Sequence, residues 1–340
     1  MQIESLTKAV LGPSLLAASL VLAGCAGNSG LGAPTAVRAI SSRVDAQPDT
    51  PCVAQTCIYV ANHNEDSITV YHHTASGNVV PVHTISGGNT DLDEPAELAL
   101  DAARNLYVTN ASNNTVAVFP PGANGNVAPI QFIAGYGTGL SFPEGIAVDS
   151  AAQIYVANIN ANSVTVFATG ATGNASPIRT IAGAATGLSQ PSGITIDASG
   201  LVYATNLGNS TVTVYPSLAN GNVAPIRTIS GAGTGLTAPK DLALAPNGRL
   251  YVTNYGNYSI TVYAPNANGN AAPIHTIIGS NTTLNAPFGI DIFGNRLFVA
   301  NIFSASVTVY PTNANGNVSP VRTIAGSNTG MFDTWGLAVR

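Results

Sequence analysis

Charged side chains are scarce in this 340-residue sequence, at 8% of residues against about 25% in ordinary soluble domains. The 11 Lys and Arg residues form no basic stripe and the pI is near 5.4, which argues against a nucleic-acid partner. The Ala, Glu, Lys, Leu and Arg richness of long helices is also missing, so a coiled coil is excluded. Because hydrophobic residues make up 45% and the net charge is −5, the chain is not a disordered one. The composition indicates a β-rich, weakly charged, exported protein.

A hydrophobic run long enough to span a membrane is missing near the N-terminus. Residues 9–22 are apolar, a length that suits a signal-peptide core and is too short to cross a bilayer comfortably. The run ends in Leu22-Ala23-Gly24-Cys25, which resembles the bacterial lipobox, where a peptidase cuts before a cysteine that then carries lipid. An ordinary cleaved signal with a chance cysteine is the alternative.

We therefore expect residues 1–24 to be a lipoprotein signal peptide, and residues 25–56 to be a lipidated Cys25 followed by a flexible tether. The lipid predicts a protein anchored in a bacterial cell envelope, on the periplasmic or the outer-surface side of a membrane.

Only three cysteines are present, and Cys52 and Cys57 lie outside the lipobox. In an oxidising envelope a disulfide between these two is the expected use, with free thiols as the alternative. A metal site would need more soft ligands nearby, and the sequence has none there.

An internal repeat of 48 residues organises the rest of the chain. An Asn follows a strand-like apolar run in each copy, at Asn62, Asn110, Asn158, Asn206, Asn254 and Asn301. A Gly-Asn pair keeps the same period, beginning at Gly77, Gly125, Gly173, Gly221, Gly269 and Gly316. Periods of about 20–50 residues indicate solenoids, propellers or arrays.

One copy of the repeat resolves into four short β-branched or aromatic runs bounded by turn residues, namely Gly145–Asp149, Ile154–Asn158, Ser163–Phe167 and Pro177–Ala182. The Asn-Gly pairs between the third and fourth runs predict two-residue hairpins, because both residues tolerate positive φ. Six such units predict an all-β fold, a six-bladed β-propeller of four-stranded antiparallel blades over residues 57–340. The first copy lacks its first strand, and the C-terminal Gly336–Arg340 matches that strand. We expect this C-terminal strand to complete the first blade and close the ring, whereas a solenoid would have capping repeats at both ends.

The strand pair Gly145–Asp149 and Ile154–Asn158, followed by Val164–Phe167, resembles the NHL-repeat family of six-bladed propellers, and more distantly the gluconolactonase-like and TolB-like propellers. The resemblance covers residues 58–340 and implies the fold more strongly than an activity. The family often has Asp where this chain has its repeated Asn. Some related propellers are lyases, lactonases or hydrolases with a metal near the central channel, but no ligand set matches residue by residue, so no catalytic residue is carried over.

Differences between the copies single out candidate site residues. Two of the four connections in each copy vary, and we call the face that carries them the variable face; the opposite, repetitive face carries the Gly-Asn connections. The position entering each innermost strand reads Ala96, Glu144, Ser192, Lys240, Phe288 and Trp335, and the next position reads Glu97, Gly145, Gly193, Asp241, Gly289 and Gly336. We expect this ring to lie at the mouth of the central channel. The candidate ligand-binding residues are Glu97, Glu144, Lys240, Asp241, Phe288 and Trp335, with Tyr255 and Tyr258 from the loops.

Acidic residues near the first blades form a second candidate site. Asp91, Asp93, Glu94 and Glu97 could hold Ca²⁺ through oxygen ligands, bind a basic partner, or supply an acid/base pair. A solvated acidic loop is the alternative. For the loop aromatics, a stacking platform for a sugar or peptide competes with simple packing at the rim. No motif requires a cofactor, and Ca²⁺ is the one that these residues would suit.

Two functions fit these observations. The first is a monomeric, membrane-anchored envelope lipoprotein whose propeller face binds a protein, peptide or glycan, with no catalysis evident. The alternative is a metal-assisted hydrolase, lactonase or lyase at the channel mouth that uses Glu97, Glu144 or Asp241, which convergence of these carboxylates on one point would favour. Strand order also predicts that the tether leaves the repetitive face, so the variable face points away from the membrane.

Overall fold

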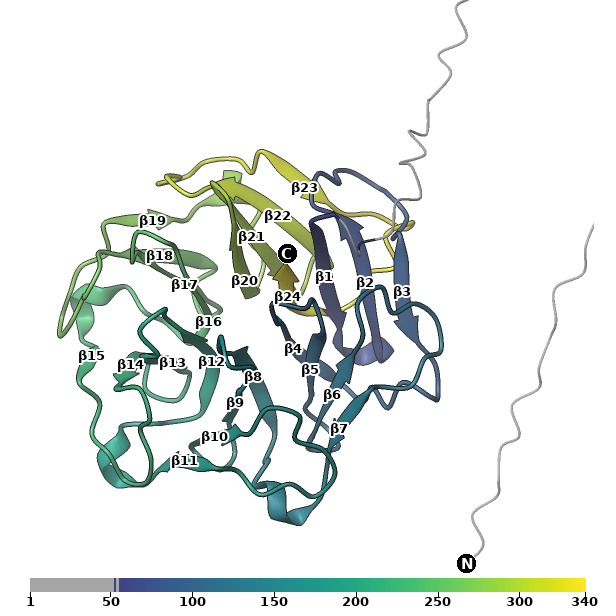
Figure 1. Cartoon of the computed structure of the whole chain (residues 1–340). Helices are drawn as coiled ribbons and strands as arrows, with labels where there is room; N and C mark the ends of the chain where they lie inside the picture. Colours follow the sequence, from purple (N-terminus) through teal and green to yellow (C-terminus); the bar gives the residue numbers. More distant parts are fainter. Residues whose placement is uncertain (1–51, 53–54) are drawn as a thin grey trace, which may run out of the picture. The chain divides into compact units, whose positions relative to one another are not determined.

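The computed structural model describes Cys52 and residues 55–340, which form six four-stranded antiparallel sheets arranged in a ring (Figure 1). Blade 1 joins the two ends of the chain, in the order β24 (Thr334–Val339), β1 (Cys57–Asn62), β2 (Ser67–His72) and β3 (His83–Ser86). Blade 2 consists of β4 (Pro95–Leu100), β5 (Leu106–Asn110), β6 (Thr115–Phe119) and β7 (Gln131–Ile133). Blade 3 consists of β8 (Pro143–Val148), β9 (Ile154–Asn158), β10 (Ser163–Phe167) and β11 (Arg179–Ala182). The predicted fold class is confirmed.

The remaining three blades repeat this order from the channel outward. Blade 4 consists of β12 (Pro191–Ile196), β13 (Val202–Asn206), β14 (Thr211–Tyr215) and β15 (Arg227–Ile229). Blade 5 consists of β16 (Pro239–Leu244), β17 (Leu250–Asn254), β18 (Ser259–Tyr263) and β19 (His275–Ile277). Blade 6 consists of β20 (Pro287–Phe293), β21 (Arg296–Asn301), β22 (Ser306–Pro311) and β23 (Arg322–Ile324).

Short 3-10 turns are the helical elements of the described residues, namely η1 (His63–Glu65), η2 (Tyr136–Thr138), η3 (Ala184–Thr186), η4 (Ala232–Thr234) and η5 (Ser280–Thr282). In this part of the chain, no helix has the length and apolar character needed to cross a membrane.

The hydrophobic core lies between the blades. Every residue of β9 and β10 is buried, because a neighbouring blade packs against each face of their sheet. Tyr155 and Val164 of blade 3, for example, share a cluster with Ile194 and Tyr215 of blade 4. Burying one such side chain contributes about 1.5–3 kcal/mol, so each blade depends on its neighbours for stability. This arrangement explains why the strands carry apolar residues or Thr at successive positions.

The last strand closes the ring. β24 pairs antiparallel with β1 through Ile58 with Val339, Tyr59 with Ala338 and Val60 with Leu337. Two backbone hydrogen bonds between Cys57 and Arg340, at 2.9 and 3.1 Å, complete the pairing at the repetitive face. The predicted closure by the C-terminal strand is therefore confirmed.

The repeated Asn ties each second strand to the loop that leads into its own blade. In blade 3 the Asn158 amide is fully buried, and its Nδ2 donates to Thr165 Oγ1 at 3.1 Å. Its Oδ1 accepts from the backbone N–H of Ser141 at 3.1 Å. An Asp carboxylate would supply no donor, so the amide suits this double contact better than the Asp of the resembling family.

The Asn-Gly pairs, such as Asn124-Gly125, do not form the two-residue hairpins that the sequence predicts. In blade 2, Gly125 forms a parallel bridge to Ile85 of blade 1, and its N–H donates to Thr84 O at 2.7 Å. The Oδ1 of the following Asn126 accepts from Asn89 N at 2.8 Å. The same bridge recurs at the other blade boundaries, including Gly77 with Ile324 where the ring closes. The hairpin prediction was wrong because these residues bind the neighbouring blade instead of turning the chain.

The chain enters blade 1 on the repetitive face. A disulfide joins Cys52 and Cys57 just before β1 runs toward the variable face. Cys57 pairs with His72, whereas Asn62 at the far end of β1 pairs with Ser67 and lies opposite Thr334. Cys57 is therefore at the opposite end of blade 1 from the variable loops, as strand order predicts. The predicted signal peptide, residues 1–24, the lipidation site Cys25 and almost all of the tether lie outside the described residues.

Candidate functional site

Each inner strand carries an irregularity close to the variable face. In β16, Pro239 pairs with Asn254 but the register has shifted by Leu242, which leaves Lys240 and Asp241 in a bulge. Adjacent inner strands approach closely here: a Cβ added to Gly336 would lie 2.6 Å from the Cα of Glu97, and one added to Gly193 would lie 2.6 Å from the Cα of Asp241. Glycine in these copies therefore makes room for the two acidic residues of the neighbouring blades.

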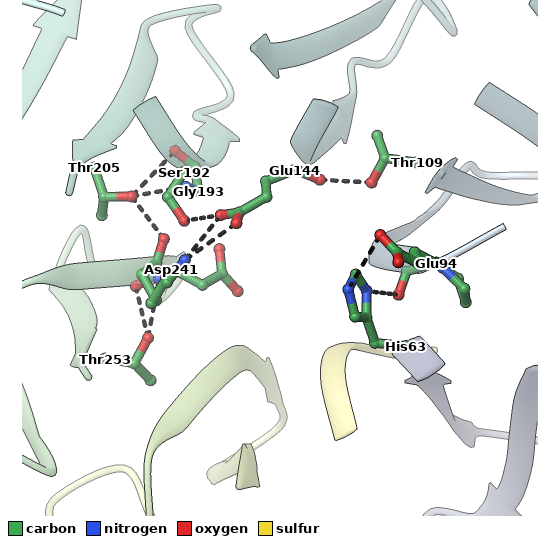
Figure 2. Close-up of polar contacts among 11 residues, drawn as sticks. His63, Glu94, Thr109, Glu144, Ser192, Gly193, Thr205, Asp241 and Thr253 are labelled. Atoms are coloured by element: carbon green, nitrogen blue, oxygen red, sulfur yellow. Dashed lines mark hydrogen bonds and ion pairs between the residues drawn. The ribbon is translucent and has the colours of Figure 1, made fainter. Parts of the chain in front are cut away.

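Three candidate side chains from different blades meet at the variable-face end of the channel. Lys240 Nζ lies 3.1 Å from Glu144 Oε1, and the Ser192 hydroxyl donates to Glu144 Oε2 (Figure 2). The side chains of Glu144 and Lys240 are only 2% and 11% exposed. Lys240 Nζ also lies 4.6 Å from the centroid of the Phe288 ring, which places its charge over an aromatic face. The ion pair is thus almost fully removed from solvent.

Stacked rings continue this layer toward blade 1. Trp335 lies 4.7 Å from Phe288 and stacks on His63, with centroids 3.5 Å and planes 7° apart. His63 Nε2 lies 3.7 Å from Glu94 Oε2, and its Nδ1 lies 3.3 Å from Pro95 O (Figure 2). Burial lowers the pKa of His63, while the Pro95 carbonyl and the charge of Glu94 act in the opposite direction. His63 was not among the predicted site residues, although its position in a variable loop was visible in the sequence.

Five residues of the predicted ring therefore fill the variable-face end of the channel. We call them the channel plug: Glu144, Ser192, Lys240, Phe288 and Trp335. All of them except Trp335 are buried, so this layer offers a ligand little accessible surface in the structure. Glu97 and Asp241 are also buried, and they contribute to the cavity described below.

The predicted calcium ligands Asp91, Asp93, Glu94 and Glu97 are not gathered into a metal site. Within the described residues, no group of three or more His, Cys, Asp or Glu side chains is placed to hold a metal ion. Glu97 is buried on β4, whereas Asp91 is exposed in the loop before this strand. Asp66, another loop carboxylate, accepts from Glu94 N at 2.8 Å. β4 carries Glu97 into the channel and leaves Asp91, Asp93 and Glu94 on the loop before it, so the four acids do not share one site in the described residues.

Below the plug, the central channel holds a cavity of about 310 Å³ that extends along the inner strands as far as the exposed Arg340. Its exposed lining is mainly polar, and three carboxylic acids belong to it: Glu97, Asp241 and Asp291. Each accepts hydrogen bonds from backbone N–H groups at the inner strand edges. Glu97 Oε1 accepts from Leu98 and Leu337, both at 3.1 Å.

The other two acids do the same in blades 5 and 6. Asp241 Oδ2 accepts from Ile290 N at 2.9 Å. Asp291 accepts from Ile292 N and Val339 N, both at 2.7 Å. Inner strands have an unpaired edge that faces the channel, so these carboxylates satisfy donors that no further strand reaches.

Burial raises the pKa values of all three acids. The pKa of Asp241 rises to about 7 and that of Asp291 to about 6, in both cases chiefly because burial penalises the charged form. Burial and then the charge of Asp241 raise the pKa of Glu97 well above its usual range. The cavity therefore contains carboxylic acids that can hold protons near neutral pH, which is the property of a general acid or base.

Asp291 was not predicted as a site residue, although the repeat contained a signal for it. The fifth position of the inner strands reads Ala99, Ala147, Thr195, Ala243, Asp291 and Ala338. A single carboxylate among small side chains marks this position as different.

Exposed aromatic side chains gather on the variable face over blades 5 and 6. Phe303 contacts both predicted tyrosines edge-to-face, with its centroid 6.1 Å from that of Tyr255 and 6.4 Å from that of Tyr258. Phe303 is 60% exposed and Tyr258 is 40% exposed. We call these three residues the aromatic platform. The loops β17–β18 and β21–β22 hold its rings, whereas Trp335 belongs to the channel plug.

Residues 52–182 match a family model described as lactonase, 7-bladed beta-propeller, whereas the described chain forms six blades. No curated protein matches the chain. A solved protein of unknown function from Bacteroides caccae is similar with a TM-score of 0.61 and 11% identity, over 85% of this chain and 99% of that one. The nidogen/laminin complex gives a TM-score of 0.57 at 16% identity, over 84% of this chain and 98% of the other. Streptogramin B lyase gives 0.51 at 17% identity, over 69% and 70%. At these identities the likeness shows the propeller fold alone.

Proposed function

We propose that this protein is a lipid-anchored binding protein of the bacterial envelope whose variable face takes a glycan or a peptide on the aromatic platform. The observation that supports this most directly is the contact of Phe303 with Tyr255 and Tyr258 at a solvent-exposed position. Rings held by one another lose little conformational freedom on binding, and they offer faces for stacking together with the phenolic hydroxyls.

The neighbouring channel plug favours binding over catalysis at this face. Glu144 is neutralised by Lys240 and bonded to Ser192, so it is not free to act as a base on a ligand arriving from the variable side. The three carboxylates named for the alternative enzyme do not converge on one point from that side, because Glu144 belongs to the plug while Glu97 and Asp241 line the cavity beneath.

Binding to arrays of glycans and peptides tests the proposal, with Phe303→Ala as the decisive variant. The variant removes the ring that both tyrosines contact, and we expect at least a tenfold loss of affinity for the ligand that the wild type selects. Phe332→Ala is the matched control, because Phe332 is a comparably exposed aromatic, at 56%, that makes no ring contact with the platform. Equal binding by the wild type and the Phe303→Ala variant would contradict the proposal.

A second function is supported by the acids of the cavity. Asp241 lines the channel with a pKa raised to about 7 by burial, as suits a general acid or base in a hydrolase, lactonase or lyase. Assays of lactone opening with the wild type and Asp241→Asn test this alternative. Turnover by the wild type that the variant loses, while array binding stays intact, would favour the enzyme.

A further inference from the structure

A cleft on the repetitive face lies between blades 6 and 1. It has a volume of about 420 Å³ and is lined by His73, Thr74, Phe293, Gly294, Asn295, Arg296 and Arg322. It is separate from the channel cavity and from the aromatic platform. Two guanidinium groups in one cleft are unusual in a chain with so few charges, and the repeat shows how they arose.

Blades 3 and 4 show how the outer-strand arginine is normally neutralised. In blade 3, Arg179 Nη2 donates to the Tyr155 hydroxyl at 2.8 Å, and this hydroxyl lies 3.3 Å from Asp149 Oδ2. Blade 4 repeats the arrangement: Arg227 Nη2 donates to the Tyr203 hydroxyl at 2.9 Å, and this hydroxyl donates to Asp197 Oδ2 at 3.1 Å. A tyrosine therefore connects each of these arginines to a carboxylate.

Blade 6 lacks both partners of its arginine. Phe298 stands where blade 3 has Tyr155, and Phe293 stands where it has Asp149. A second cation, Arg296, replaces Gln153, which in blade 3 accepts a hydrogen bond from the arginine. In blade 6 the positive charge has thus doubled while its neutralising groups are gone.

The surroundings of the two arginines leave their charge uncompensated. Among the described residues, neither Arg296 nor Arg322 forms an ion pair with a carboxylate. Arg322 Nη1 donates to His73 O at 2.6 Å, which orients its guanidinium, and the side chain of Arg296 makes no hydrogen bond to any residue that the structure describes. Burial and the charge of Arg296 lower the pKa of Arg322. Two like charges held close together without a counter-ion favour an anion between them.

We propose that this cleft binds a phosphate group. Two guanidinium forks match the oxygens of a phosphate, and Asn295 and Thr74 add polar side chains to the wall. Phe293 is 39% exposed beside them and forms an edge-to-face contact with His73 at 5.8 Å. The phosphate can come from the headgroup of an anionic phospholipid or from a soluble phosphate compound.

The position of the cleft, close to the point where the chain enters blade 1, favours a lipid headgroup as the source of the phosphate. His73 directly follows β2, and its N–H donates to Thr56 O at 3.1 Å, next to the point where the chain enters blade 1. The predicted lipid anchor precedes that point in the chain, so it would bring this face close to a bilayer. An anionic headgroup there is attracted by each basic side chain close to the membrane surface.

The experiment compares full chains that all carry Cys25→Ser, which removes the predicted acylation site from every sample. Arg296→Gln is the main variant, because within the described propeller the Arg296 side chain makes no hydrogen bond that the fold would lose. Arg227→Gln is the matched control, an arginine at the position in blade 4 that Arg322 has in blade 6. Calorimetry with glycerol phosphate measures the binding of a soluble phosphate compound. Sedimentation with vesicles of phosphatidylcholine, with and without phosphatidylglycerol, measures the binding of an anionic lipid headgroup.

We expect Arg296→Gln to weaken phosphate binding at least tenfold in one of the two assays. Arg227→Gln should bind as the Cys25→Ser parent does. A loss confined to phosphatidylglycerol vesicles would assign the site to a lipid headgroup, and a loss with glycerol phosphate would assign it to a soluble compound. Absence of saturable binding in both assays would overturn the proposal, as would equal binding by Arg296→Gln and the Cys25→Ser parent. These results do not depend on the aromatic platform, so they can fail or succeed separately from the proposed function.

Discussion

Replacing Lys240 by Met leaves the Glu144 carboxylate buried without its cation. In the wild type, Nζ lies 3.1 Å from Oε1 and 3.2 Å from Oε2, and the carboxylate side chain is only 2% exposed. The Ser192 hydroxyl would remain as its one polar side-chain partner. Methionine keeps most of the apolar stem of lysine, so the substitution removes the charge with little change in volume.

The size of the effect follows from the burial of the pair. Breaking a buried ion pair by removing one partner costs about 3–5 kcal/mol, because a charge remains without compensation in a poorly polarisable environment. Loss of the contact between Lys240 and Phe288 adds about 1 kcal/mol. For a domain of this size, 1 kcal/mol corresponds to about 2–4 °C in Tm, so we expect Lys240→Met, at about 4–6 kcal/mol in total, to lower Tm by roughly 8–24 °C.

Guanidinium chloride unfolding and thermal scans of a four-member cycle measure this effect. Glu144→Gln combined with Lys240→Met removes both charges and keeps an acceptor for Ser192, so we expect the double variant to recover most of the loss. Glu65→Gln is the control for removing an exposed acid on the same face. If Lys240→Met and the double variant are equally destabilised, or if neither differs from the wild type, the pair is not the buried interaction described above.

Three further predictions concern closure, the channel acids and the anchor. Deleting Gly336–Arg340 should lower Tm by more than about 10 °C in a thermal scan, because it exposes the edge of β1 and removes buried core side chains; an unchanged Tm would rule out closure by β24. Asp241 has a pKa raised from 3.8 to about 7, so the native state resists ionisation and loses stability as the pH rises from about 4 to 7. Asp241→Asn should therefore match the wild type near pH 4 and exceed its stability above pH 7, and denaturant midpoints that show the reverse order would contradict the burial argument. Cys25→Ser should move the protein from the membrane fraction to the soluble fraction, and a variant that still sediments with membranes at high salt would contradict lipidation.

The fold could be predicted from the sequence because a propeller uses the same positions in every blade. Radial sheets bury Val164 and Val166 between two neighbours, and the same requirement recurs 48 residues later at Val212 and Val214. The missing first strand and the matching C-terminal segment then predicted closure. The role of the Asn-Gly pairs was harder to predict, since this dipeptide also suits a tight hairpin, and only the neighbouring blade shows that the Gly125 N–H donates to Thr84 O instead.

For the candidate sites too, the sequence identified some of the residues but not the contacts between them. Comparison of copies identified Glu97, Lys240 and Asp241 as departures from the repeat, because a substitution in one copy is visible against the others. Their partners were not visible: Glu144 and Lys240 are 96 residues apart, and Arg322 meets His73 across 249 residues.

The sequence by itself determined the blade, the number of blades and the positions where one copy differs from the rest. Only the tertiary structure decided which of those differences meet. Curving six copies into a closed ring brings inner strands from separate blades to one axis and sets the last blade beside the first. A one-dimensional period contains no information about these contacts, because it repeats along the chain and they form across the ring.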